Sequence, residues 1–390
     1  MRSVYIAGHN IITSLGITTA ENMAAMEAGA IGIRMTSNPR LFPTPIPLSL
    51  VDSGVLEEKF EAVLAFHKKT DECSSFTRLE KFLIISVHEA IAPLEQDFRD
   101  NRTLFVVSTT KGNIDLLETR SASLFPPKRI YLWEMARIVG SFFGFANPPM
   151  IISNACISGI MALMAAFRYM KSGLYDQAVV TGGDILSEFV ISGFQSFQSI
   201  SPNPCRPYDA GRDGLSLGEG AGTMVLTTKK TNDTEKHITI AGAATSNDAN
   251  HISGPSRTGE ELALAMQKSM TEAGLSPSEM GFINAHGTAT PFNDEMESKA
   301  IALAGLVEVP VNSFKGYWGH TLGAAGLIES VASIQSLKNQ RLIRSAGFET
   351  LGVPEPIRVI ASNEDKEISS CMKSASGFGG CNAAIMFELK

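Results

Sequence analysis

The stretch "PPMIISNACISGIMALMAAF", residues 148–167, decides the fold. An apolar, strand-like segment turns abruptly through a short polar run, and Cys156 stands at the corner before residues 159–167, which carry almost no polar side chain. A helix without a polar stripe is expected to be buried on every side, between layers. Residues 323–337 form a second run of this kind in the other half of the chain. The pattern predicts an α/β protein whose halves are structural duplicates packed around two central helices.

Strand-like and helical segments alternate along the rest of the chain, as in other α/β proteins. Thr18 and Glu21 have capping-box spacing at the start of one predicted helix. Thr258 and Glu261 repeat this spacing at the start of another helix, which is expected to end near Gly274. A polar junction between the halves is predicted at residues 227–237, and strands are predicted at residues 4–8, 104–109, 150–155, 177–183, 222–228 and 237–244.

Composition restricts the class of protein. The 390 residues are 44% hydrophobic and 19% charged, which is typical of a globular protein, and the net charge of -7 argues against nucleic acid as a main partner. Five cysteines without C-x-x-C spacing favour a reducing compartment. The N-terminus shows no signal-peptide pattern, and no apolar run approaches the ~20 residues of a membrane span. We therefore expect a cytoplasmic protein that does not span a membrane.

Cys156 is a candidate nucleophile because of its place at a strand-to-helix corner. Such a turn presents the side chain outward, and the unpaired N–H groups of a helix start can lower a thiol pKa. The plainer alternative is a small buried hydrophobic residue. Two candidate partners follow strand-like runs elsewhere: His286, and His320 with Lys315 five residues before it. The alternative is that both histidines are structural and that the Gly-Ala-Ala-Gly run 323–326 serves close helix packing.

Five motifs, in this order and approximate spacing, resemble those of the β-ketoacyl-acyl-carrier-protein synthases of the thiolase-like superfamily that use a Cys-His-His triad. The resemblance covers nearly the whole chain. It implies an α/β thiolase-like fold with five α-β-α-β-α layers, an N-terminal half over residues 1–228 and a C-terminal half over residues 229–390. The motifs are "SNACISG" (153–159), "RPYDAGRDGLSLGEGAG" (206–222), "AHGTATPFND" (285–294), "KGYWGHTLGAAGLIE" (315–329) and "SGFGGCNA" (376–383).

The resemblance implies the roles of the catalytic residues. Cys156 would accept the acyl group as a thioester. His286 and His320 would donate hydrogen bonds to the malonyl thioester carbonyl and stabilise the enolate formed when CO2 leaves. Lys315 and Glu329 would keep the histidines in the required protonation state. Splitting acyl transfer through a thiolate replaces one difficult step with two easier ones.

The resemblance also implies substrate-binding residues. The backbone N–H groups of Cys156 and Phe378 would form the oxyanion hole. Phe378, followed by Gly379, would act as a gate between the thiol and the malonyl entrance. Thr288 and Thr290 match the threonines that hold the phosphopantetheine arm.

Several supporting residues have plainer alternatives. Asp294, a supporting residue in the family, could simply bind backbone amides, and Glu329 must be paired or protonated in an apolar helix whatever its function. Cys381 is interpreted as a small packing residue beside the site. The histidines lack metal-ligand spacing, so no catalytic metal is expected. A strand-like run follows the glycines of residues 214–222, which excludes a dinucleotide fingerprint there. No cofactor is expected, because the substrates are carried on phosphopantetheine.

The expected partners are an acidic acyl carrier protein, malonyl and acyl thioesters, and a second subunit in a homodimer or a heterodimer. Arg78 and Lys81 resemble the basic docking helix of the family, although they could equally be an ordinary solvated face. Lys111 stands where family members usually have a small or aliphatic residue, and residues 112–155 form a shorter segment than usual. Both departures predict an unusual acyl substrate or a rearranged acyl pocket.

The leading hypothesis is a 3-oxoacyl-[acyl-carrier-protein] synthase of fatty acid or polyketide/polyene synthesis. The alternative is a non-condensing chain-length partner of a heterodimeric synthase, but such partners usually lack the nucleophilic cysteine. A thiolase would need a second reactive cysteine, and a primer-loading synthase has asparagine where His320 stands. The acyl chain length and the pathway are left open.

Overall fold

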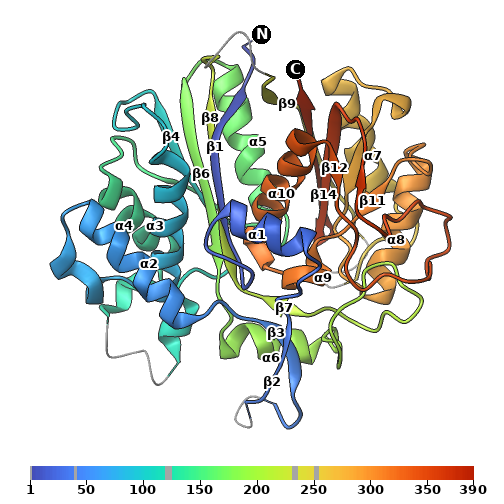
Figure 1. The fold of residues 1–390 in the computed structure, drawn as a ribbon, viewed down its shortest axis with the longest axis horizontal. Helices are drawn as coiled ribbons and strands as arrows, with labels where there is room; N and C mark the ends of the chain where they lie inside the picture. The colour runs from blue at the N-terminus through green and yellow to red at the C-terminus, as the bar shows by residue number, and fades with distance from the viewer. Residues whose placement is uncertain (1, 39–41, 119–124, 231–235, 250–253) are drawn as a thin grey trace.

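The computed structural model describes residues 2–38, 42–118, 125–230, 236–249 and 254–390, without the side chain of Cys73. Two sheets and three layers of helices alternate across the molecule (Figure 1). This is the predicted five-layer α-β-α-β-α arrangement, which is thereby confirmed.

The N-terminal sheet has the strand order β5-β4-β6-β8-β1. The β6–β4 and β4–β5 pairs are parallel, whereas β8 runs antiparallel to both of its neighbours. Buried apolar side chains fill β4 and β6, as expected for strands covered on both faces. The bounds are β1 (Tyr5–Ile12), β4 (Thr103–Ser108), β5 (Met150–Ile152), β6 (Gln177–Asp184) and β8 (Gly220–Thr227).

The C-terminal sheet repeats this topology strand for strand. Its order is β11-β10-β14-β15-β9, and β15 is again antiparallel to both neighbours while the remaining pairs are parallel. One pairing, between Tyr5 and Thr239, joins the two sheets edge to edge. The sequence prediction of a structural duplication is therefore confirmed. The bounds are β9 (Ile238–Asn247), β10 (Phe282–Asn284), β11 (Val311–Asn312), β14 (Ser370–Gly377) and β15 (Cys381–Leu389).

Helices cover both outer faces and fill the space between the sheets (Figure 1). The outer layers are α2 (Ser53–Phe66), α3 (Arg78–Ile91) and α4 (Leu132–Phe143) on one side, and α7 (Glu260–Ala273) and α8 (Pro291–Leu303) on the other. The central layer contains α5 (Ser158–Lys171) and α10 (Ala325–Asn339). The remaining elements are α1 (Thr19–Glu27), β2 (Arg34–Thr36), β3 (Ile46–Ser49), α6 (Glu188–Ser196), β7 (Leu217–Gly218), α9 (Lys315–Trp318), β12 (Arg341–Leu342) and β13 (Glu364–Asp365).

The two central helices touch through glycines. A Cβ atom added to Gly159 would lie 2.6 Å from the backbone nitrogen of Leu327, and one added to Gly326 would lie 2.8 Å from the nitrogen of Ile160. The Gly-Ala-Ala-Gly run therefore does serve close packing. Helix α10 is buried on nearly every side, as predicted, but α5 is not, because Met161, Met164 and Ala165 are partly exposed.

The capping boxes had different outcomes. The box of Thr18 and Glu21 is present at the start of α1. The box predicted for Thr258 and Glu261 is wrong: α7 begins one residue too late for it, and its N-cap is Gly259, with φ +79° and no side-chain cap. A Cβ on Gly259 would lie 2.7 Å from a backbone oxygen of α8, so close helix packing excludes a capping side chain there. Gly274 ends α7 in the left-handed conformation, as predicted.

The predicted junction lies between the end of β8 and the start of β9, and residues 231–235 of it lie outside the described residues. The division at residues 228 and 229 stays a prediction. Four cysteines, Cys156, Cys205, Cys371 and Cys381, are buried and free. No helix in the described part of the chain combines the length and apolar character needed to cross a bilayer.

Candidate active site

The corner that carries Cys156 is a strained turn between β5 and α5. Ala155 has φ +43°, which costs an L-residue roughly 1–2 kcal/mol, so packing must hold it in place. Ser158, the first residue of α5, accepts a hydrogen bond from the Asn154 N–H at 2.8 Å and donates one to the Ala155 carbonyl at 2.6 Å. These bonds fix the turn and hold the sulfur at the start of the central helix.

His320 is held by the glycine-rich segment 214–222. Its N–H donates to the Ser216 carbonyl at 2.7 Å, and its carbonyl accepts from the Gly218 N–H at 3.0 Å. A Cβ on Gly218 would lie 2.0 Å from the Trp318 carbonyl oxygen, so only glycine fits at this position. This contact gives the glycine-rich motif a role other than nucleotide binding. Glycine at position 218 lets the backbone of the motif approach the backbone at Trp318 and His320 closely enough to form these hydrogen bonds.

His286 follows β10 on a tightly bonded turn. The Glu297 carboxylate of α8 accepts the main-chain N–H of His286 at 2.7 Å and that of Gly287 at 2.5 Å. Gly287 has φ +44°, and an added Cβ would lie 2.5 Å from the Cβ of Ser313. The backbone around His286 is therefore fixed by a buried carboxylate that the sequence analysis did not identify.

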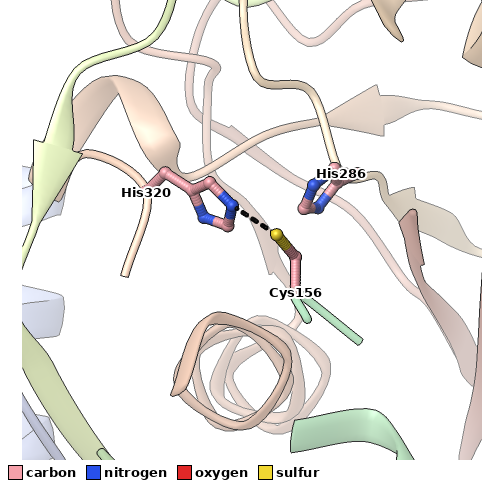
Figure 2. Close-up of side chains that lie close together, drawn as sticks. All are labelled: Cys156, His286 and His320. Atoms are coloured by element: carbon pink, nitrogen blue, oxygen red, sulfur yellow. Dashed lines mark hydrogen bonds between the residues drawn. The ribbon is translucent and has the colours of Figure 1, made fainter. Parts of the chain in front are cut away.

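The structure brings the three side chains together, as the sequence predicted (Figure 2). Cys156 Sγ lies 3.0 Å from His320 Nε2, within hydrogen-bonding distance. The rings of His286 and His320 are 5.1 Å apart between centroids and nearly perpendicular, at 88°. All three residues are buried, and neither Nδ1 atom has a hydrogen-bond partner among the described residues. One thiol from the first half thus meets two imidazoles from the second.

Protonation at the site is dominated by burial. Burial raises the pKa of the Cys156 thiol to about 12, with the Lys315 charge acting in the opposite direction. The sequence suggested that the helix start would lower the pKa of this thiol. Burial acts in the opposite direction and outweighs that effect. Burial, with the Lys315 charge second, also lowers the pKa values of His286 and His320 well below the usual range. The resting site therefore holds a neutral thiol beside two neutral imidazoles.

A buried ion cluster lies behind the histidines. Lys315 Nζ and Glu329 Oε1 are 2.7 Å apart and both side chains are inaccessible to solvent, so the pair implied by the resemblance is present. Lys373 on β14 contacts the other carboxylate oxygen of Glu329 at 2.5 Å and is also buried. No sequence motif pointed to Lys373. A charged residue within the strand-like run before the terminal glycine motif is the signal that could have found it.

A cavity of about 350 Å³ opens onto the triad. Thr288 and Thr290, whose hydroxyl groups lie 2.9 Å apart, line it together with Cys156 and both histidines. Phe378 also lines it, with its ring packed against Phe194 and Phe197 at centroid distances of 5.7 and 5.1 Å. The lining does not include Gly379, whose φ of +86° shows that the backbone requires glycine there.

Other predicted supporting residues have structural contacts. Asp294 is fully buried and accepts the main-chain N–H groups of Tyr208 and Ala289, as the plainer alternative proposed, and burial raises its pKa to about 7. Cys381 is buried beside the site with its Sγ 3.4 Å from the Phe378 carbonyl oxygen. Local sequence patterns also did not point to Asp184 at the end of β6, which accepts hydrogen bonds from residues 109 and 110 and, at 2.8 Å, from the Gly323 N–H.

The predicted docking residues already have partners. Arg78 contacts the buried carboxylate of Glu219 at 2.5 Å, and Lys81 contacts Glu57 at 2.6 Å. Because both charges are paired, the docking role gains no support from the geometry and stays a prediction. Lys111 is exposed and near enough for its charge to lower the pKa of Cys156 slightly, but it is not part of the cavity lining. Its effect on the acyl pocket also stays a prediction, and residues 119–124 of the shortened segment are not described.

Among the described residues, the triad is the one group of histidine, cysteine and acidic side chains close enough to hold a metal ion, with its donor atoms within 4.8 Å of one another. The thiol and one imidazole already share a hydrogen bond, which favours acid–base and nucleophilic chemistry. The expectation that no metal or cofactor takes part stays a prediction.

Models of two domains match the chain in succession. The N-terminal domain of β-ketoacyl synthases matches residues 1–232, and their C-terminal domain matches residues 237–349. The chain belongs to the β-ketoacyl synthase family. It is a condensing acyltransferase of fatty acid or polyketide synthesis, and the non-condensing alternative is not favoured.

Individual relatives agree with this family. The chain is 30% identical over 350 residues to the 3-oxoacyl-[acyl-carrier-protein] synthase 2 of Staphylococcus aureus strain N315, which covers 83% of this chain and 84% of the relative. A β-ketoacyl synthase from Burkholderia phymatum has the same fold, with a TM-score of 0.89, 24% identity and full coverage of both chains. A ketosynthase in complex with its chain length factor, from Xenorhabdus doucetiae, has a TM-score of 0.83 at 24% identity and covers 100% of this chain and 98% of that one.

Proposed function

We propose that this family member is a 3-oxoacyl-[acyl-carrier-protein] synthase in which Cys156 carries the growing acyl group. The observation that supports this proposal is the 3.0 Å contact between Cys156 Sγ and His320 Nε2 inside a cavity that His286 also lines. A nucleophile within hydrogen-bonding distance of a base is the arrangement that covalent acyl transfer needs.

In the first step, Cys156 Sγ attacks the carbonyl carbon of the incoming acyl thioester. The thiol proton passes to His320 Nε2 as the new C–S bond forms. The C–S bond to the pantetheine arm then breaks, and its thiolate leaves with that proton. The backbone N–H groups of Cys156 and Phe378 stabilise the tetrahedral oxyanion. Because burial raises the pKa of the Cys156 thiol, the free protein keeps the thiol protonated. The proton therefore moves to His320 only when the thiol attacks a bound substrate.

In the second step, the malonyl thioester loses CO2, and the electrons of the broken C–C bond form an enolate. His286 and His320 donate N–H hydrogen bonds to the enolate oxygen, each from the ring nitrogen that carries a proton. Among the described residues neither Nδ1 atom has a partner that fixes the tautomer, so either nitrogen can carry the proton of a neutral ring. The enolate carbon then attacks the Cys156 thioester, and the released thiolate takes up a proton. Thr288 and Thr290 hold the pantetheine arm in the cavity.

Intact-protein mass spectrometry tests this proposal. After incubation with an acyl carrier thioester, the wild-type protein is expected to gain the mass of one acyl group, and the Cys156→Ala variant none. Cys205→Ala is the matched control, because Cys205 is also buried and free. It should acylate normally. An acyl adduct on the Cys156→Ala variant would overturn the nucleophile assignment.

We propose that an acyl carrier protein delivers both substrates. The name of the Staphylococcus aureus relative, 3-oxoacyl-[acyl-carrier-protein] synthase 2, includes this carrier. In this chain Cys156 is buried and lines the cavity, which favours a substrate carried on a long, slender arm such as phosphopantetheine. A short thioester free in solution should therefore react at a much higher KM than the same acyl group on its carrier.

We propose that a second copy of this chain covers the free edge of the N-terminal sheet. Among the described residues, strand β5 is paired along one edge only, and its residues, with Met161 and Met164 of α5, are partly exposed and apolar. An open apolar edge strand pairs readily with another strand. Light scattering should give twice the chain mass of 41.8 kDa. A monomer would overturn this proposal, and the neighbour that binds a chain length factor makes a mixed dimer the alternative to test by co-expression.

A further inference from the structure

Lys373 is a buried cation for which the reaction described above has no role. It lies on β14, in register with Asn284 of the parallel strand β10, and its side chain is inaccessible to solvent. The ammonium group donates to the Ala285 carbonyl at 3.0 Å and ion-pairs with Glu329 Oε2 at 2.5 Å. Burying such a charge is costly unless it is paired and hydrogen-bonded, as it is here.

The Ala285 carbonyl belongs to the peptide group that leads into His286. The N–H of this same peptide group donates to Glu297 Oε1 at 2.7 Å. Lys373 therefore binds the oxygen end and Glu297 the N–H end of one peptide group. Charge-assisted hydrogen bonds are about twice as strong as neutral ones, so this peptide plane, and with it the direction of the His286 side chain, is fixed at both ends.

Lys373 also contributes to the electrostatic environment of the imidazoles. The titratable side chains near the His286 ring are Cys156, His320, Lys315 of α9 and Lys373 of β14, while Glu297 of α8 binds its main-chain N–H and Glu329 of α10 pairs with the two lysines. The two lysines enclose Glu329 from both sides, and both of their charges lower the pKa values of the histidines. Neither Nδ1 has a partner among the described residues, so burial comes first and these lysine charges second in lowering the pKa values of both rings.

We propose that Lys373 is a positioning residue of the condensation step. It orients His286, a donor to the enolate oxygen, through the 285–286 peptide group, and its charge adds to that of Lys315 in disfavouring protonation of both imidazoles. This inference rests on the proposed function, because it assigns Lys373 to the step in which the enolate forms. Glu329 then acts as the shared counter-ion that makes two buried lysines tolerable beside the triad.

The Lys373→Met variant tests the inference, because methionine keeps much of the lysine volume without the charge. Loss of the Ala285 contact should lower kcat for condensation by about 10²-fold with little change in KM, as small misplacements of reacting groups do. Removing a cation also makes a protonated imidazole less unfavourable, so the histidine pKa values rise. The acidic limb of the kcat/KM profile should therefore move to higher pH. Acyl transfer to Cys156, which uses His320, should fall less than condensation.

Cys371→Ala is the matched control. Cys371 is buried on the same strand two residues away, so this variant perturbs the same face of β14 without removing a charge. It should lower the melting temperature and leave the pH profile unchanged. An unshifted acidic limb in Lys373→Met, or equal shifts in both variants, would overturn the inference.

A second measurement covers the case in which Lys373→Met does not fold. In the wild-type protein, NMR titration of ¹³C-labelled histidines should show both triad rings neutral at a pH well below the ordinary histidine pKa of about 6.5. Triad rings that titrate near 6.5 would overturn the inference. Failure of the proposed function is distinguishable, because the wild-type protein would then gain no acyl mass at all.

Discussion

The two central helices begin at equivalent corners of the same duplicated fold but differ in charge. Helix α5 begins just after Cys156, and its buried face is made of small and apolar side chains. Helix α10 begins after His320 and carries the buried Glu329 between Lys315 and Lys373. The topology of the surrounding strands is the same in both halves. The shared topology therefore places a strand-to-helix corner in each half. The two corners differ in their buried charges, and this difference sets the chemistry that each can support.

This difference has a physical reason. A thiol is a small, weakly polar group that an apolar corner can hold without a counter-charge. Burial is the main cause that keeps the two imidazoles neutral, and nearby cations add to it, but such charges must be paired when they are buried. Duplication gave both halves the same frame, and among the described residues the ion cluster lies at the corner of the second half.

Substitution of each histidine in turn is the strongest test of the difference between the two corners. His320→Ala removes the partner of the Cys156 thiol, so acyl transfer should slow by about 10²–10⁴-fold, the range of general base catalysis. His286→Ala should leave acyl transfer nearly unchanged and slow malonyl decarboxylation by about 10²–10³-fold. Mass spectrometry of the acyl-enzyme and release of labelled CO2 measure the two half-reactions separately.

His88→Ala is the control for this pair. His88 is a buried histidine of α3 whose ring nitrogen lies 3.2 Å from His67, and it does not line the cavity. Neither half-reaction should change in this variant. If both triad variants slowed acyl transfer equally, the separation of roles between the imidazoles would be wrong.

The contact between the two helices can be tested through its glycines. Gly159→Ala places a Cβ against the backbone of α10, so the unfolding free energy should fall by about 1–3 kcal/mol. The helices must also move apart, which separates Cys156 from His320 and slows acyl transfer. Chemical denaturation and acyl-enzyme kinetics measure the two effects.

Gly193→Ala in α6 is the matched control, because nothing lies within 4 Å of its added Cβ. Removing a helical glycine there should raise the unfolding free energy by up to about 1 kcal/mol. Equal responses of Gly159→Ala and Gly193→Ala would contradict the close contact between α5 and α10.

The smallest expected effect concerns docking on the outer layer. Lys81 is paired with Glu57, and a paired surface charge contributes only about 0–1 kcal/mol. Lys81→Gln should therefore raise KM for the carrier-bound substrate by about twofold, with no change for a small thioester mimic. Steady-state kinetics with both substrates measures this, and equal changes for the two would reject a docking role.

Much of the site could be read from local patterns. A lone cysteine between an apolar strand and an apolar helix, and histidines after two further strands, pointed to the three side chains that the structure brings together. The glycines of residues 323–326 pointed to close helix packing. These features are visible in sequence because each is a local rule: a strand end, a helix start, or a position where only a small residue fits.

Other features could not be read in this way. Glu297 and Lys373 lie 11 and 87 positions beyond His286, and each looks like an ordinary charged residue until β10 and β14 pair and α8 packs against them. The capping box at Thr258 failed because α8 lies against Gly259. The thiol pKa went the opposite way from the local argument because burial is a property of the whole fold.

The sequence by itself determined the duplicated α/β pattern and pointed to the cysteine and the two histidines of the candidate site, since these depend on residue type and on position within single elements. Only the tertiary structure decided which charges surround the imidazoles and which protonation states the site holds. The physical reason is that electrostatic free energy depends on distance and burial, and both are set by segments that meet only when the chain folds.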